Sequence, residues 1–104
     1  MKFLCLAYGD ERKWNALPKS TRDALRAQDD LLRSRGDLVA EALAPTTVRF
    51  AGGHGQASDG TFGRAPLPLA GFYVIEARDM DEAIGLLSQT PCAHAGAYEI
   101  RPLA

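Results

Sequence analysis

Hydrophobic residues fall into runs of two kinds, and these runs predict both strands and helices. Lys2–Tyr8 is short and almost wholly apolar, which predicts a strand buried on both faces or nearly so. Between Pro18 and Gly36 the apolar residues recur at helical spacing, which predicts a helix. Ser20 stands three residues before Asp23 at the start of this helix and suggests a capping box.

The middle of the chain has shorter apolar runs and many glycines. Leu38–Leu43 and Thr46–Ala51 each have the length of a strand and are separated only by Ala44-Pro45, so we predict that they pair with each other. Five glycines lie between residues 52 and 63. Regular structure there carries a large entropic cost, and we therefore predict a flexible loop.

The last third of the chain has the strongest strand signal. Leu69–Ala77 is rich in aromatic and β-branched residues and predicts a strand. Asp79 can cap the helix that follows, with Glu82 at the reciprocal position, and we expect this helix to end near Gln89. Ala97–Pro102 alternates apolar and charged residues and predicts the final strand.

The predicted order is strand, helix, three strands, helix, strand. This order indicates an α+β fold of the ferredoxin-like βαββαβ plan, with an extra strand or hairpin in the middle. Two helices would cover one face of a mainly antiparallel sheet, and its other face would also be apolar. A second copy of the chain is the simplest cover for that face, so we expect a homodimer.

Composition narrows the class of protein. A chain of 104 residues fits a single domain, 1–104, and its 46% hydrophobic and 24% charged residues are ordinary for a globular protein. The net charge of −1 gives no electrostatic basis for nucleic-acid binding, and polar residues follow Tyr8 too soon for a signal peptide or a membrane span. We interpret the protein as cytoplasmic, with Cys5 and Cys92 as buried thiols rather than a disulfide or metal ligands.

Short motifs along the whole chain resemble a known family. They are Tyr8-Gly9-Asp10-Glu11 with Trp14, Asp59-Gly60-x-Phe62, Gly71-Phe72-Tyr73 with Glu76, Asp81-Glu82-Ala83, Pro91, and Glu99-x-Arg101-Pro102. In this order and spacing they are similar to the YCII-like proteins of the DGPFAETKE group. The resemblance implies a dimeric α/β-barrel arrangement, in which two ferredoxin-like sheets pack face to face, and in some members an association with sigma factors.

The sequence also departs from the family pattern. The charged half of the signature is absent, because its Pro falls on Thr61 and its Glu-Thr-Lys-Glu stretch falls on residues 64–67, Arg-Ala-Pro-Leu. Some relatives are thought to use a His on the first long helix and an Asp before the Pro that follows the later helix. The corresponding positions here are about Leu25 and Thr90, so that acid/base pair cannot be transferred to this chain.

Polar residues near the signature are the remaining candidates for chemistry. His54 could act as a base and Asp59 could accept a proton, although a solvated loop histidine and a turn-forming Asp-Gly pair are the structural alternatives. We predict a ligand-binding set made of Tyr8, Asp10, Asp59, Phe62 and Arg64. No spacing in the sequence suggests a metal site, a nucleophilic triad or a cofactor.

Three functions are compatible with these observations. The first is a small-molecule-binding or regulatory domain of unknown molecular function, and the second is a minor enzyme with acid/base chemistry on a small polar substrate. The third is a protein-interaction module linked to a sigma factor. Fold resemblance does not choose among them.

Overall fold

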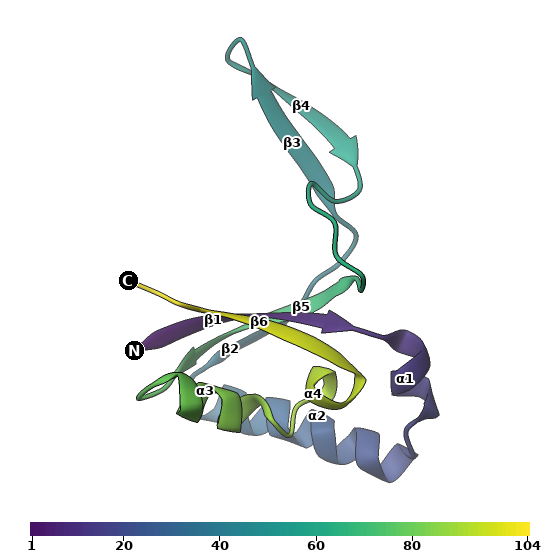
Figure 1. Ribbon diagram of the computed structural model, residues 1–104, viewed down its shortest axis with the longest axis vertical. Coiled ribbons are helices and arrows are strands. Elements are labelled where there is room, and N and C mark those ends of the chain that lie inside the picture. Colours follow the sequence, from purple (N-terminus) through teal and green to yellow (C-terminus); the bar gives the residue numbers. More distant parts are fainter.

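The computed structural model describes residues 1–104 as a four-stranded sheet with helices on one side and a separate two-stranded hairpin (Figure 1). The helices and strands in chain order are β1 Lys2–Gly9, α1 Glu11–Ala16, α2 Lys19–Ser34, β2 Leu38–Glu41, β3 Thr46–Ala51, β4 His54–Asp59, β5 Leu69–Glu76, α3 Met80–Leu87, α4 Pro91–Ala95 and β6 Gly96–Pro102.

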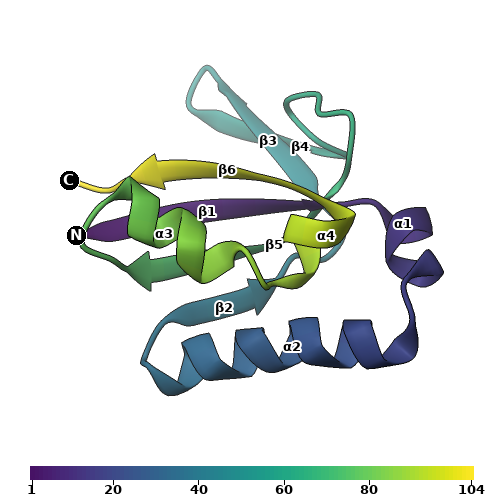
Figure 2. The same cartoon turned by 60° about the horizontal axis from the view of Figure 1, so that its bottom comes forward.

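The main sheet has the strand order β2-β5-β1-β6, and every neighbouring pair is antiparallel. This is the predicted ferredoxin-like α+β plan, with the β3–β4 hairpin inserted between its second and third strands. Helices α2, α3 and α4 lie on the same face of the sheet, and the hairpin extends from the other side (Figures 1 and 2). None of the helices combines the length and apolar character that crossing a membrane requires.

The core lies between the sheet and its helices. Phe3, Cys5 and Ala7 of β1 point toward the helices and are buried, as alternation along a strand requires. Leu32 of α2 packs into the same cluster. On the other face, which we call the open face, the β1 and β5 side chains are only half-buried. The expectation that the first strand is buried on both faces is therefore wrong for the single chain.

The long helix begins differently from its prediction. Its N-cap is Pro18, which has no side-chain hydroxyl to offer, so the Ser20 capping box does not form. Asp23 instead accepts a hydrogen bond of 2.7 Å from Lys19, one turn earlier. The two short helices α1 and α4 were not predicted from the sequence. Asp10 caps α1 by accepting hydrogen bonds from the backbone N–H groups of the next turn.

The middle of the chain differs most from the structure predicted for it. Residues 38–41 pair with β5, whereas β3 pairs with β4, so the two runs predicted to pair do not contact each other as strands. Residues 54–59 form a strand rather than a flexible loop. Gly52 and Gly53 both have positive φ and make the tight turn between the two strands, which explains why glycines gather there. We call β3, the turn and β4, residues 46–59, the arm.

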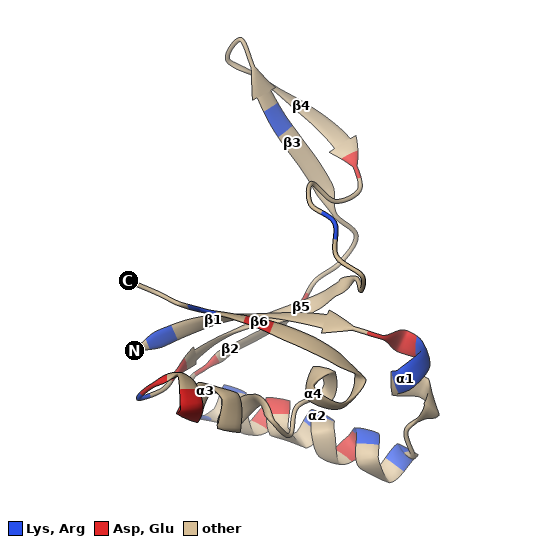
Figure 3. Cartoon of the chain, in the orientation of Figure 1, with Lys and Arg blue, Asp and Glu red and all other residues tan.

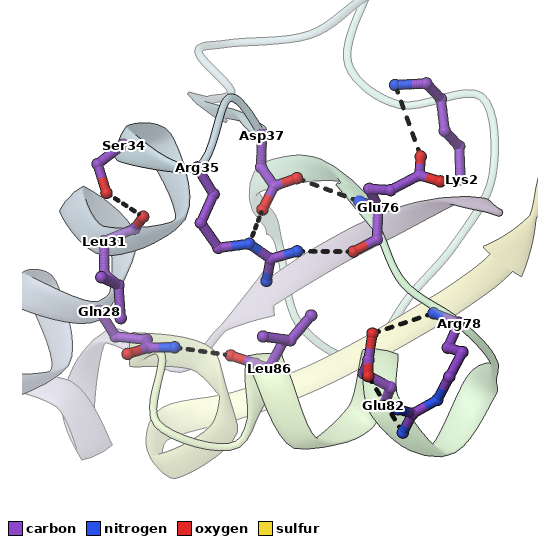
Figure 4. A network of polar contacts seen from close by, with 10 residues as sticks. All are labelled: Lys2, Gln28, Leu31, Ser34, Arg35, Asp37, Glu76, Arg78, Glu82 and Leu86. Carbon is purple, nitrogen blue, oxygen red and sulfur yellow. Dashed lines mark hydrogen bonds and ion pairs between the residues drawn. The ribbon is translucent and has the colours of Figure 1, made fainter.

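Polar contacts join the α2–β2 turn and the helices to the sheet (Figure 4). Asp37 accepts a hydrogen bond from the Glu76 N–H at 3.1 Å, and Arg35 donates to the Glu76 carbonyl at 2.8 Å. Gln28 of α2 donates to the Leu86 carbonyl of α3. The α3 cap confirms its prediction, because Asp79 accepts from the Glu82 N–H. This helix ends two residues earlier than expected, at Leu87.

Candidate functional site

A cavity of about 570 Å³ opens on the helix side of the sheet, where α1, α2 and α4 meet the ends of β1, β2 and β5. Its apolar wall includes Ala7, Val39, Ala70 and Pro91. Pockets that bind small molecules have this size and combine apolar walls with a few polar groups. Its polar lining groups come from the start of α1, from α2, from the end of β2 and from the central strand β5.

Asp29 is the carboxylate that α2 presents to the sheet. It lies four residues after Leu25 and three before Leu32, so helical periodicity places it on the buried face of α2. The Tyr73 hydroxyl donates a hydrogen bond of 2.6 Å to Asp29 Oδ1. Burial is the largest influence on Asp29 and raises the pKa of its carboxyl, while the Tyr73 bond and Arg33 act in the opposite direction.

A chain of hydroxyl groups continues behind Tyr73. The Tyr98 and Tyr73 rings pack edge to face with centroids 5.7 Å apart, and their oxygens are 3.4 Å apart. Tyr98 also contacts Thr90 Oγ1 at 2.5 Å, and Thr90 Oγ1 bonds to the Leu87 carbonyl at 2.5 Å. Burial raises the pKa of Tyr98 to about 12. Burial also raises the pKa of Tyr73, so both phenols are neutral at physiological pH.

The proton positions in this chain follow from counting donors. A carbonyl only accepts, so Thr90 gives its single proton to Leu87. Tyr98 must then donate to Thr90, and Tyr73 donates to Asp29. No proton is left for the Tyr73–Tyr98 contact, which agrees with its length of 3.4 Å. The chain ends at Asp29, where Tyr73 stabilises the ionised carboxylate at the cavity wall.

Charges around the cavity mouth are mostly negative. Its lining contains two arginines and five carboxylates, namely Asp10, Glu11, Asp29, Asp30 and Glu41. Arg33 forms a 3.0 Å ion pair with Asp30, and the Arg26 guanidinium lies 5.1 Å from the centre of the Trp14 ring. With the arginines engaged in this way, the cavity favours a neutral or cationic ligand over an anion.

The two cysteines are buried as expected. Cys92 lies in the cavity lining and Cys5 lies in the core. Burial raises the pKa of Cys92, and it raises the pKa of Cys5 to about 11, with the nearby Asp37 charge as a second cause. Both thiols therefore stay protonated and are poor nucleophiles. No three His, Cys, Asp or Glu side chains come together as metal ligands would.

The residues singled out from the sequence do not gather in one place. His54 and Asp59 are the first and last residues of β4, and both are exposed on the arm. Phe62 and Arg64 are exposed in the segment after the arm, where Arg49 stacks on the Phe62 ring at 5.1 Å. Asp10 lines the cavity and caps α1, whereas Tyr8 lies on the open face, opposite Ala97.

Sequence reasoning missed Asp29 and Tyr73, which line the cavity, and the roles of Tyr98 and Thr90 in the hydrogen-bonded chain behind them. One signal was present in the chain, because a carboxylate at position 29 falls on the same helical face as Leu25 and Leu32. Thr90 was noticed only as a departure from the family pattern. The structure shows it fully buried, with its hydroxyl inside the network.

Replacing Asp29 by asparagine is expected to stabilise the protein at pH 7, by about 0.5–1 kcal/mol. The variant keeps an acceptor oxygen for Tyr73 and removes a charge whose burial is unfavourable. Because the pKa of Asp29 is raised in the folded state, its contribution to stability is fully present below the ordinary value of 3.8 and is lost as pH rises through the folded pKa. The advantage of the variant should therefore vanish near pH 3.

Urea unfolding at pH 7 and at pH 3 measures this difference. Asp30→Asn is the matched control, since Asp30 is the neighbouring carboxylate and is exposed, and we expect less than about 0.5 kcal/mol from it. An Asp29→Asn variant that is less stable than the wild type at pH 7 would show that the ionised carboxylate stabilises the fold.

Comparisons with known proteins agree with this architecture. A protein of Rhizobium meliloti (strain 1021), the uncharacterised protein R00369, is 30% identical over 115 residues that cover 100% of this chain and 93% of the relative. The solved structure of 5-chloro-2-hydroxyhydroquinone dehydrochlorinase (TftG) from Burkholderia phenoliruptrix AC1100, in complex with 2,5-dihydroxybenzoquinone, superposes with a TM-score of 0.51. It is 15% identical and the match covers 100% of this chain and 94% of that one, a similarity that shows the fold.

The sequence as a whole matches the family profile of the YCII-related domain over residues 1–104. Together with the ferredoxin-like sheet described above, this match establishes that the chain belongs to the YCII-related domain family.

Proposed function

We propose that the protein binds a small, polar, neutral or cationic molecule in the cavity between α2 and the sheet. The observation that carries this proposal is the Asp29–Tyr73 pair, which lies in the wall of a cavity of about 570 Å³. A carboxylate facing apolar walls offers a ligand a strong acceptor, and the surrounding carboxylates disfavour an anion.

Acid/base chemistry on the bound molecule is the second candidate, and the same pair favours it. A carboxylate whose pKa is raised by burial is a stronger base than an exposed one, and Tyr73 holds its oxygen in place. TftG, whose solved structure has a similar fold, is named a 5-chloro-2-hydroxyhydroquinone dehydrochlorinase, so this fold occurs in an enzyme. That likeness concerns the fold, and the chemistry proposed here rests on Asp29.

A ligand screen tests both candidates. The purified protein is heated with a panel of small phenols, amines, alcohols and carboxylic acids, and unfolding is followed in the wild type, Asp29→Asn and Tyr73→Phe. A ligand present at a hundred times its dissociation constant adds about 2.7 kcal/mol of stability. We expect neutral or cationic compounds to stabilise the wild type and to lose most of this effect in both variants.

Asp59→Asn is the control, because Asp59 belongs to the exposed arm. If Asp59→Asn removes the effect and Asp29→Asn does not, the site lies on the arm and the proposal is wrong. Compounds that bind are then incubated in D₂O and analysed by NMR. Deuterium entering a carbon position with the wild type but not with Asp29→Asn supports proton transfer, whereas binding without exchange supports a binding protein.

We also propose that the domain works as a homodimer in the cytoplasm. The open face carries Leu4, Leu6, Phe72 and Val74 at its centre, all of them only half-buried in the single chain. Its edge carries Glu99 and Arg101, which pair with each other at 2.8 Å. An apolar centre with a charged edge suits an interface between two copies. The free thiols of Cys5 and Cys92 suit a reducing compartment.

A further inference from the structure

The arm is the least covered part of the molecule. Every residue of β4 is exposed, and in β3 only Thr47 is buried, where its hydroxyl donates to the Gly60 carbonyl at the base of the arm. The ribbon shows the arm standing away from the sheet (Figure 1). A two-stranded hairpin of this kind is marginally stable by itself in water, so the arm requires something to pack against.

The two faces of the arm differ in chemistry. Val48, Phe50 and Ala57 share one face, since Val48 pairs with Ala57 and alternate residues of a strand point the same way. The Phe50 ring lies across Gly55, where a side chain would meet it at 3.1 Å. The opposite face carries Arg49 and its partner Gln56. Phe50 is nevertheless 77% exposed, so the apolar face of the arm has no cover within its own chain.

The chain is less compact, and exposes more surface, than a compact domain of its length. Its radius of gyration is 15.5 Å, against about 13 Å for a compact domain of this length. Its accessible surface is 7175 Å², whereas a compact monomer of this mass exposes about 5,700 Å². The excess of about 1,500 Å² exceeds the roughly 800 Å² that each partner contributes to a standard interface.

Charge along the chain points to the same segment. Residues 42–68, which comprise the arm and its two connections, contain only three charged side chains, Arg49, Asp59 and Arg64. Figure 3 shows few red or blue segments on the arm and its connections and many on the helices. Interface cores are depleted in charged residues, whereas free surfaces are not.

A second copy of the chain is the occupant that the geometry favours. The arm rises on the side of the open face, opposite the helices (Figure 1). A strand of six residues spans about 20 Å, twice the separation of two packed sheets, so an arm on this side must lie beside any copy stacked on the open face. We propose that each arm docks its Val48–Phe50–Ala57 face on the body of the partner, so that two arms clasp the dimer.

The inference rests on the homodimer proposed above, and the experiment separates the two. Sedimentation equilibrium gives the dimer dissociation constant for the wild type, Phe50→Lys on the apolar face of the arm, Gln56→Lys on its polar face, and Leu6→Lys on the open face. We expect Phe50→Lys to weaken the dimer at least thirtyfold, as the loss of a buried aromatic anchor does, and Gln56→Lys to change it less than threefold.

Three outcomes overturn the proposal in different ways. If Phe50→Lys dimerises as tightly as the wild type while Leu6→Lys is monomeric, the dimer through the open faces is supported and the clasp is rejected. A wild type that is monomeric at 100 µM rejects both the dimer and the clasp. The proposed ligand site does not depend on this result. In a mixture of ¹³C-labelled and unlabelled wild type, NMR contacts from Phe50 to the other chain are expected, and purely intramolecular contacts contradict the proposal even if the variants misfold.

Discussion

Replacing Gly71 with alanine is expected to lower the free energy of unfolding by about 2–3 kcal/mol. Gly71 lies in β5 between Ala7 of β1 and Glu41 of β2. A Cβ at this position would collide with the carbonyl oxygen of Ala40. Because the obstacle is backbone rather than a flexible side chain, β2 must move away from β5. Hydrogen bonds of the edge strand and the wall of the cavity beside Val39 would be disturbed together.

Gly85→Ala is the matched control for this substitution. Gly85 is exposed in α3, and no atom lies near the place of an added Cβ. Alanine in a helix is favoured over glycine by about 0.5–1 kcal/mol, so the same chemical change should stabilise the protein here. Urea unfolding of the two variants checks both signs. A Gly71→Ala variant as stable as the wild type would show that β2 accommodates a side chain without loss of pairing.

Replacing Thr90 with valine is expected to destabilise the protein by about 2 kcal/mol and to lower the pKa of Asp29. Valine has nearly the same shape but loses two hydrogen bonds of the buried Thr90 hydroxyl, one accepted from Tyr98 and one donated to the Leu87 carbonyl, each worth about 0.5–1.5 kcal/mol. The Tyr98 proton then becomes available to Tyr73. A Tyr73 hydroxyl that accepts this proton donates more strongly to Asp29 and favours the ionised carboxylate.

Thr90→Ser keeps the hydroxyl and removes only a methyl group, so we expect a loss of about 1 kcal/mol and an unchanged Asp29 titration. Urea unfolding measures the stability of both variants. Carboxyl ¹³C chemical shifts followed against pH measure the Asp29 titration directly. An Asp29 pKa that rises or stays constant in Thr90→Val would contradict the proton order inferred for the chain from Leu87 to Asp29.

The Gly71 and Thr90 substitutions also separate a structural role from a role at the site. Gly71 acts through the spacing of two backbones, and its replacement should affect stability and ligand binding together. Two hydroxyl groups, those of Tyr98 and Tyr73, separate Thr90 from Asp29, so its replacement should change the titration of Asp29 while the Asp29–Tyr73 contact persists. Thr90 is therefore a positioning residue, and Asp29 is the group placed to touch a ligand.

Local patterns in the sequence determined most of the elements. The apolar run at the N-terminus, the helical spacing after Pro18 and the aromatic run before Glu76 each correspond to a strand or helix of the structure. Asp79 caps α3 as predicted, because a cap depends only on residues within one turn. The ferredoxin-like order followed from these elements, since few arrangements bury two amphipathic helices on an antiparallel sheet.

Strand partners were decided by the tertiary structure. The run beginning at Leu38 is adjacent in sequence to Thr46–Ala51, yet it pairs with β5, which lies some thirty residues further on. Strand pairing depends on which hydrophobic faces meet in space, and proximity along the chain is a weak guide to it. The same limit hid β4, because its glycines and polar residues have low strand propensity and are held by pairing with β3.

The candidate site belongs almost entirely to the tertiary structure. Asp29 and Tyr73 are 44 residues apart in sequence and bond at 2.6 Å only because α2 packs across β5. Burial, which raises the pKa of Asp29, arises from that same packing and has no counterpart in the local sequence. The sequence by itself therefore determined the elements and the family of this protein, while the meeting of distant elements in space decided its cavity, its arm and its chemistry.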